Sequence, residues 1–102
     1  MKNVLPTKTI LIMDDDESHR IQLRETLAWA AEELFEDHLE VTSMATGSQA
    51  FDFIKKVQPD MIISATHIRA AGAIITLRQN EDPSVLLRLC LSLLGLSLRP
   101  LM

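Results

Sequence analysis

TILIMDDD, the stretch from Thr9 to Asp16, decides the fold that we expect for this chain. Its apolar part shows little alternation with polar residues, which is typical of a strand that is covered on both faces. Three carboxylates then end the strand, because they cannot be buried without partners. Asp16 can also cap a following helix. The stretch therefore predicts a buried strand whose carboxyl end presents acidic side chains.

Helices and strands alternate along the rest of the chain. In chain order we expect a helix at residues 17–35, a strand at 40–44, a helix at 48–57, a strand at 61–64 and a third helix at 73–78. This alternation is typical of a parallel sheet with helices on both faces. Right-handed crossovers leave few topologies for such a sheet. The sequence therefore predicts a doubly wound α/β domain with a parallel sheet of at least four strands.

Length and composition narrow the class of protein. The 102 residues suffice for one small domain with one core. A net charge of −4 and the lack of a basic stripe argue against nucleic acid as a direct partner. A single cysteine, Cys90, cannot form an intramolecular disulfide and indicates a reducing compartment. The most apolar stretch, residues 85–98, contains Arg88 and is too short to span a bilayer. We therefore expect a cytoplasmic protein without a membrane partner.

The last part of the chain, residues 84–102, differs in composition, because it has no acidic residue and about half of its positions are leucine. Leucines at 87, 89, 91 and 93 alternate with Arg88, Cys90 and Ser92, which predicts a fourth strand. Read as a helix, the same stretch would be apolar nearly all round. Two interpretations remain open: the leucines are buried against another subunit in a homodimer, or the chain has lost its native ending through truncation or a shifted reading frame.

Three blocks of the sequence resemble the receiver domain of two-component response regulators. The blocks are TILIMDDDE from Thr9, LEVTSMATGSQA from Leu39 and PDMIIS from Pro59, and the resemblance covers residues 8–78. It implies a flavodoxin-like doubly wound sheet, with a C-terminal third that is incomplete or atypical. Residues 1–83 then form a receiver-like core, and residues 84–102 form a leucine-rich C-terminal segment. The implied partner is a sensor histidine kinase or another two-component protein.

The resemblance also implies a site. Asp14 and Asp15 match the family's acidic pair, with Asp15 the more direct ligand of Mg²⁺, and His67 would offer its backbone carbonyl to the metal. The family's phosphate-accepting aspartate maps to Ala65, so the nucleophile and one carboxylate ligand are missing. Binding of Mg²⁺ is therefore expected to be weakened. Ser92 is the nearest candidate for the family's switch hydroxyl.

Ala65 has three explanations: it is natural in a degenerate receiver, it is an introduced loss of the acceptor, or the alignment is out of register. Ser64 and Thr66 are poor substitutes, because neighbouring side chains of a strand point to opposite faces. The leading hypothesis is a non-enzymatic phosphorelay module that signals by protein–protein contact. One alternative is an inactive variant or truncated product of a phosphorylatable response regulator. Another is a small metal-dependent phosphatase-like enzyme, which would need a nucleophilic aspartate near the acidic pair.

Overall fold

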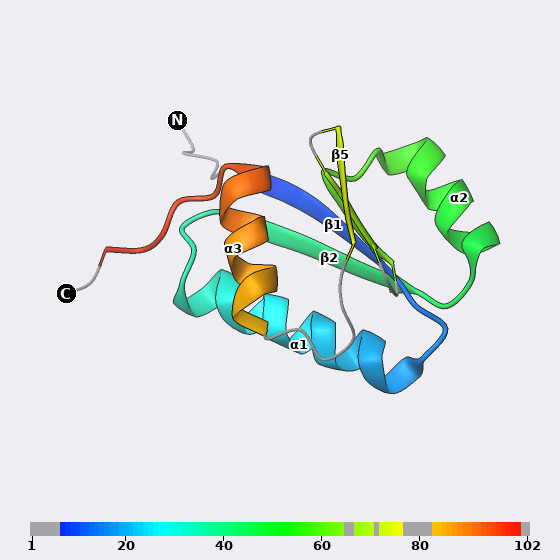
Figure 1. Cartoon of the computed structure of the whole chain (residues 1–102), viewed down its shortest axis with the longest axis horizontal. Coiled ribbons are helices and arrows are strands. Elements are labelled where there is room, and N and C mark those ends of the chain that lie inside the picture. The colour runs from blue at the N-terminus through cyan, green and yellow to red at the C-terminus, as the bar shows by residue number, and fades with distance from the viewer. Residues whose placement is uncertain (1–6, 65–66, 71, 77–82, 101–102) are drawn as a thin grey trace, which may run out of the picture.

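The computed structural model describes residues 7–64, 67–70, 72–76 and 83–100. In these residues the chain forms three helices and a five-stranded sheet, which confirms the α/β class (Figure 1). The elements in chain order are β1 (Thr7–Met13), α1 (Glu17–Glu33), β2 (His38–Met44), α2 (Gly47–Val57), β3 (Met61–Ser64), β4 (His67–Ala70), β5 (Ala73–Thr76) and α3 (Pro83–Leu94).

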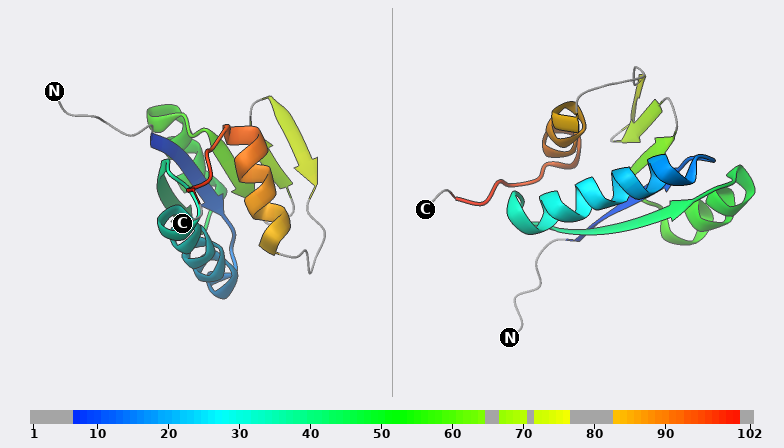
Figure 2. Two further views of the ribbon diagram at one scale, coloured as in Figure 1. Left: turned by 90° about the vertical axis from the view of Figure 1, so that its left-hand side faces the viewer. Right: turned by 90° about the horizontal axis from the view of Figure 1, so that it is seen from below.

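The sheet has the strand order β2-β1-β3-β4-β5. β1 is parallel to both β2 and β3, whereas β3, β4 and β5 follow one another as antiparallel neighbours. The chain crosses the sheet in one direction from β1 to β2 and in the other from β2 to β3. Right-handed crossovers therefore place α1 and α2 on opposite faces. Figure 2 shows this arrangement, with α3 on the same side as α1.

The core lies mainly between the sheet and the two helices α1 and α3. Ile10, Leu11 and Ile12 of β1 are each 0% exposed, which confirms that this strand is covered on both faces. Ile10 and Ile12 face the main core, and Leu11 points to the opposite face, on the side of α2. The main core contains Leu27, Ala30, Phe35, Leu39, Met61, Ile63, Ile68, Ala70, Leu86, Cys90, Leu94 and Leu96 in addition.

The prediction of a third helix at residues 73–78 is wrong for residues 73–76, which the structure describes. Ala73–Thr76 is strand β5, which pairs antiparallel with β4 from Ala70↔Ala73 to His67↔Thr76. Gly72 takes a φ of +79° in the connection between the two strands, a conformation that costs glycine little. The Ile-Ile-Thr run of β5 is β-branched throughout, and such residues favour strands over helices. Residues 77 and 78 lie outside the described part of the chain.

The expected C-terminal strand is also wrong, because Pro83–Leu94 is helix α3. Proline is tolerated in the first turn of a helix, and leucine is a strong helix former. The buried residues Leu86, Cys90 and Leu94 recur every four positions and so form one helix face. Leucine at nearly every other position conceals this period in the sequence. The three residues join the core cluster of β1, so the leucine-rich segment shares one core with residues before 84.

The segment after α3 is held against the loop that follows α1. The Glu36 N–H donates to the Ser97 carbonyl at 2.9 Å, and the Arg99 N–H donates to the Leu34 carbonyl at 2.7 Å. The Ser97 N–H donates in turn to Oδ1 of Asp37 at 2.7 Å. The C-terminal segment is therefore hydrogen-bonded to the residues that follow α1, and it does not extend the parallel part of the sheet.

Candidate functional site

The candidate site lies where β1 and β3 end side by side. Met13 and Ser64, the last residues of the two strands, are register partners. The strand order reverses between β1 and β3, and ligands of open α/β sheets bind at such a reversal, at the carboxyl ends of the strands. Asp14 follows β1 directly, and its N–H donates to the Met44 carbonyl of β2 at 3.1 Å. Ala65, which follows Ser64 in the sequence, lies outside the described residues.

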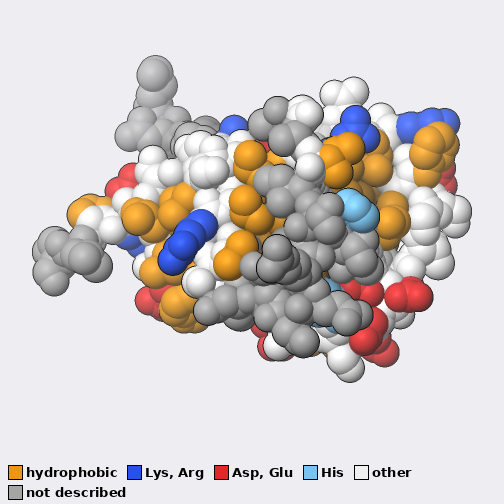
Figure 3. Space-filling model, in the orientation of Figure 1, with side chains coloured by type: hydrophobic (Ala, Val, Ile, Leu, Met, Phe, Trp, Pro, Cys, Tyr) orange, Lys and Arg blue, Asp and Glu red, His pale blue; other side chains and the backbone are white. Residues whose placement is uncertain are grey.

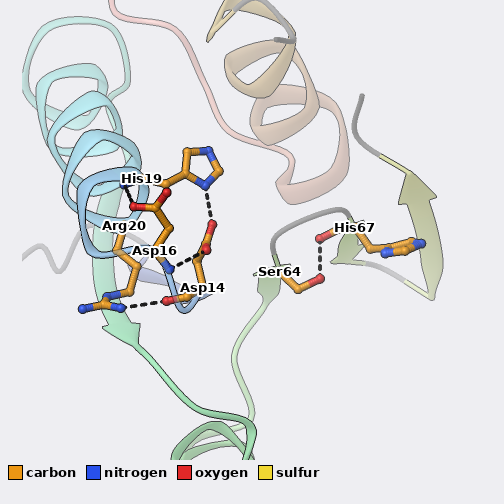
Figure 4. Close-up of polar contacts among 6 residues, drawn as sticks. All are labelled: Asp14, Asp16, His19, Arg20, Ser64 and His67. Carbon is orange, nitrogen blue, oxygen red and sulfur yellow. Dashed lines mark hydrogen bonds and ion pairs between the residues drawn. The ribbon is translucent and has the colours of Figure 1, made fainter. Parts of the chain in front are cut away.

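Asp14 is buried, with 5% of its surface exposed, and both of its carboxylate oxygens have partners. Oδ1 accepts a hydrogen bond from the Asp16 N–H at 3.0 Å, and Oδ2 is paired with Nδ1 of His19 (Figure 4). The Arg20 guanidinium donates to the backbone carbonyl of Asp14 at 2.8 Å. The start of α1 therefore folds back onto the end of β1 through one carboxylate and one carbonyl.

The ionisation of Asp14 follows from two opposing effects. Burial by itself raises the pKa of this carboxyl group. The hydrogen bonds from Asp16 and His19 and the positive charges of His19 and Arg20 together outweigh burial, and they hold the pKa of Asp14 below its ordinary value of 3.8. Asp14 is consequently a carboxylate at neutral pH.

His19 belongs to this site, although the sequence analysis did not single it out. A carboxylate can only accept hydrogen bonds, so Nδ1 of His19 carries the proton that it shares with Asp14. The position of His19 has a local cause: Asp16 caps α1 by accepting from the His19 N–H at 3.2 Å. Helical side chains point back toward the amino end, here toward the end of β1. The cap at Asp16 could be predicted from the sequence, but no local pattern indicates that His19 pairs with Asp14.

The expected metal ligands do not assemble in the described residues. Asp15 is exposed, while both oxygens of Asp14 are engaged as above. The His67 carbonyl accepts a hydrogen bond from the Ser64 hydroxyl at 3.2 Å, and the His67 ring points away from Asp14 (Figure 4). Within the described ranges no group of three His, Cys, Asp or Glu residues could hold a metal ion. The side chains of the described residues therefore do not by themselves form the Mg²⁺ site that the resemblance implies.

Ser92, the candidate switch hydroxyl, lies on α3 and is exposed. The resemblance required a hydroxyl at the end of a strand, next to the acidic pocket. Among the described residues of 84–100 there is no strand to provide that position, since Pro83–Leu94 is helical. Ser92 is therefore not placed where the family's switch residue would act.

Acidic side chains gather at one end of the molecule. Figure 3 shows them at the lower right, over the start of α1. The exposed members of this group next to the site are Asp15, Asp16 and Glu17. Only Asp14 of the acidic triplet is buried, so the side chains of Asp15 and Asp16 are exposed to solvent.

Comparison with known proteins does not add to this geometry. No protein-family model, no curated protein and no solved structure matches the chain. In the part of the chain that the structure describes, no helix is both long enough and apolar enough to cross a bilayer. The site itself, a buried carboxylate paired with a partly exposed imidazole at the end of parallel strands, is what a functional proposal has to explain.

Proposed function

We propose that the chain is a receiver-like signalling module of flavodoxin-like type, which acts in a two-component phosphorelay of the cytoplasm. It signals by contact with a sensor histidine kinase or another two-component protein. The observation that carries this proposal is that β1 and β3 end side by side, at Met13 and Ser64, directly before the buried Asp14. Each of the three sequence blocks that resemble receivers supplies a strand of this region, since they contain β1, β2 and β3.

The module does not accept phosphate at the usual position. Phosphoryl transfer to a receiver needs a carboxylate nucleophile after β3, and the residue that follows Ser64 is Ala65. The Ser64 hydroxyl is no substitute, because it donates to the His67 carbonyl. The antiparallel hairpin of β3 and β4 also departs from the helix that the resemblance implies after the third strand. Contact with a partner protein, without phosphate at residue 65, is the function that remains.

Labelling by acetyl phosphate in the presence of Mg²⁺ tests this proposal. The unchanged chain is expected to remain unlabelled when its intact mass is measured. The Ala65→Asp variant is expected to gain one phosphoryl group, because the substitution supplies both the nucleophile and the carboxylate ligand that the acidic pair lacks. Ala65→Asn is the matched control, since asparagine has nearly the same shape as aspartate but lacks a nucleophilic carboxylate.

The outcomes separate the parts of the proposal. Labelling of the unchanged chain would show that it accepts phosphate at some position, contrary to the proposal. If Ala65→Asp stays unlabelled although its circular dichroism matches that of the unchanged chain, the pocket is not of receiver type. Labelling of Ala65→Asp that disappears in the Asp14→Asn, Ala65→Asp double variant would support the role of the acidic pocket.

A further inference from the structure

β5 is an edge of the sheet with an unpaired side. It is the last strand in the order β2-β1-β3-β4-β5, and within the described residues it pairs with β4 alone. The outer side of such a strand carries backbone N–H and C=O groups that can pair with another strand. Ile74, in this strand, is 69% exposed. The strand therefore combines open backbone groups with an exposed, β-branched apolar side chain.

β5 lacks the features that usually prevent edge pairing. Ala73–Thr76 contains no charged residue and no proline, and its register with β4 is continuous, without a bulge. The other edge strand differs, because β2 carries the exposed residues His38 and Glu40. The two edges are thus unequal, and β5 is the one whose own residues carry no charge.

We propose that β5 pairs antiparallel with β5 of a second copy of this chain, so that two sheets become one. A two-fold axis perpendicular to the sheet produces this arrangement, and it continues the antiparallel order of β3, β4 and β5. Such an axis keeps each side chain on its own face of the sheet. In the proposed register Ile74 lies opposite Ile74 of the second copy, and the two apolar side chains contact each other across the pair.

A second copy fits this edge better than a foreign strand does. The chain carries a net charge of −4, so self-association requires a surface where like charges do not meet. β5 is neutral along its whole length and meets that requirement. Foreign strands are selected by charges or by side-chain pockets beside the edge, and the described edge offers one exposed isoleucine instead.

The expected dimer is weak. A pair of four-residue strands is short beside the roughly 1,200–2,000 Å² that stable protein complexes bury. We therefore expect a monomer–dimer equilibrium that depends on protein concentration. This inference does not rest on the proposed signalling function, since pairing of β5 is independent of the residue at position 65.

Light scattering on a size-exclusion column tests the inference. The mass of the unchanged chain is expected to rise from 11.5 kDa toward twice that value as the concentration rises. Ile74→Lys should remain monomeric, because it places two ammonium groups against each other across the strand pair. Ile21→Lys is the matched control, since Ile21 is also exposed, at 39%, but lies on α1. This control is expected to dimerise like the unchanged chain.

A disulfide test does not depend on how well Ile74→Lys folds. Ile74→Cys should form a disulfide-linked dimer on mild oxidation, whereas Trp29→Cys, at a position 54% exposed on α1, should not. Cys90 is buried and is present in both variants. A monomeric mass at every concentration would overturn the inference. Dimerisation of a folded Ile74→Lys variant, equal cross-linking of both cysteine variants or a broad distribution of masses would overturn it as well.

Discussion

At Asp14, burial and hydrogen bonding act on one carboxyl group in opposite directions. Burial disfavours the charge, while the Asp16 N–H, the His19 ring and the Arg20 guanidinium favour it, and the favourable contacts prevail. The carboxylate thereby links the end of β1 to the first turn of α1. Sequence reasoning located Asp14 correctly at a strand end. It could not find the pairing with His19, because that contact depends on the direction in which the helix leaves the strand.

The pH dependence of stability should report this carboxylate. The pKa of Asp14 is lower in the folded chain than its ordinary value of 3.8, so the unfolded chain takes up the proton more readily. The stabilisation is therefore complete above about pH 3.8 and is lost as the pH falls through the folded pKa. The free energy of unfolding can be measured by urea denaturation between about pH 2 and about pH 7. As the pH falls, it should decrease less steeply for Asp14→Asn than for the unchanged chain.

The matched control for this measurement is Asp15→Asn. Asp15 is exposed, so its substitution should leave both the stability and its acid dependence nearly unchanged. At neutral pH we expect Asp14→Asn to lose about 1–3 kcal/mol, because the buried side chain then no longer accepts charge-assisted hydrogen bonds from Asp16 and His19. Equal losses in the two variants would show that the buried contacts of Asp14 do not stabilise the fold.

At the level of the elements, two hydrogen bonds join β1 to the loop that precedes β3. Oδ2 of Asp60 accepts from the Thr9 N–H at 2.8 Å, and the Asp60 N–H donates to the Thr9 carbonyl at 2.8 Å. Asp60 thus extends the pairing of β1 and β3 by one residue before the first register pair, Ile10↔Met61. The Asp60 carboxylate accepts the Thr9 N–H in the way that a backbone carbonyl of a neighbouring strand would.

Replacing Asp60 by alanine should weaken this junction. The backbone bond survives but the carboxylate bond is lost, so we expect a loss of about 1 kcal/mol in the free energy of unfolding. Asp52→Ala on α2 is the matched control, because Asp52 is an exposed aspartate outside this junction. Urea denaturation of both variants measures the difference. A loss no larger for Asp60→Ala than for Asp52→Ala would contradict the role of the junction.

The whole molecule depends on the C-terminal segment for one side of its core. Leu86, Cys90 and Leu94 of α3 pack with residues of β1 and α1 in one cluster. Cys90 is 0% exposed, and its sulfur lies 4.0 Å from the sulfur of Met61 in β3. The leucines that we considered as a dimer surface therefore pack largely against the core of the same chain.

The reactivity of Cys90 tests whether α3 is docked in solution. Burial raises the pKa of the Cys90 thiol to about 12, and a thiol reagent needs both the thiolate and access to it. Labelling by an aromatic disulfide should therefore be slow in native buffer and become fast as urea unfolds the chain. The Trp29→Cys variant is the internal control, because its added cysteine lies at an exposed position on α1 and should react at once. Rapid labelling of Cys90 in native buffer would mean that α3 is not packed on the sheet.

Local signals explain which parts of the fold the sequence determined by itself. The apolar run before Asp14, the helix cap at Asp16 and Pro59 after α2 act on neighbouring residues, so β1, α1, β2, α2 and β3 could be predicted within a few residues. The acidic end of β1 followed for the same reason. These features make up the parallel half of the sheet and one side of the candidate site.

Tertiary structure alone decided the rest. Leucine at nearly every other position hides the helical period in the sequence, so packing of Leu86, Cys90 and Leu94 against the sheet decides that residues 83–94 form a helix and not a strand. Ala73–Thr76 becomes a strand because β4 provides an edge on which it can pair. The contact of His19 with Asp14 likewise needs the strand end and the helix start in place together. Each of these outcomes depends on partners that are distant in sequence or on the relative direction of two elements, and a local pattern encodes neither.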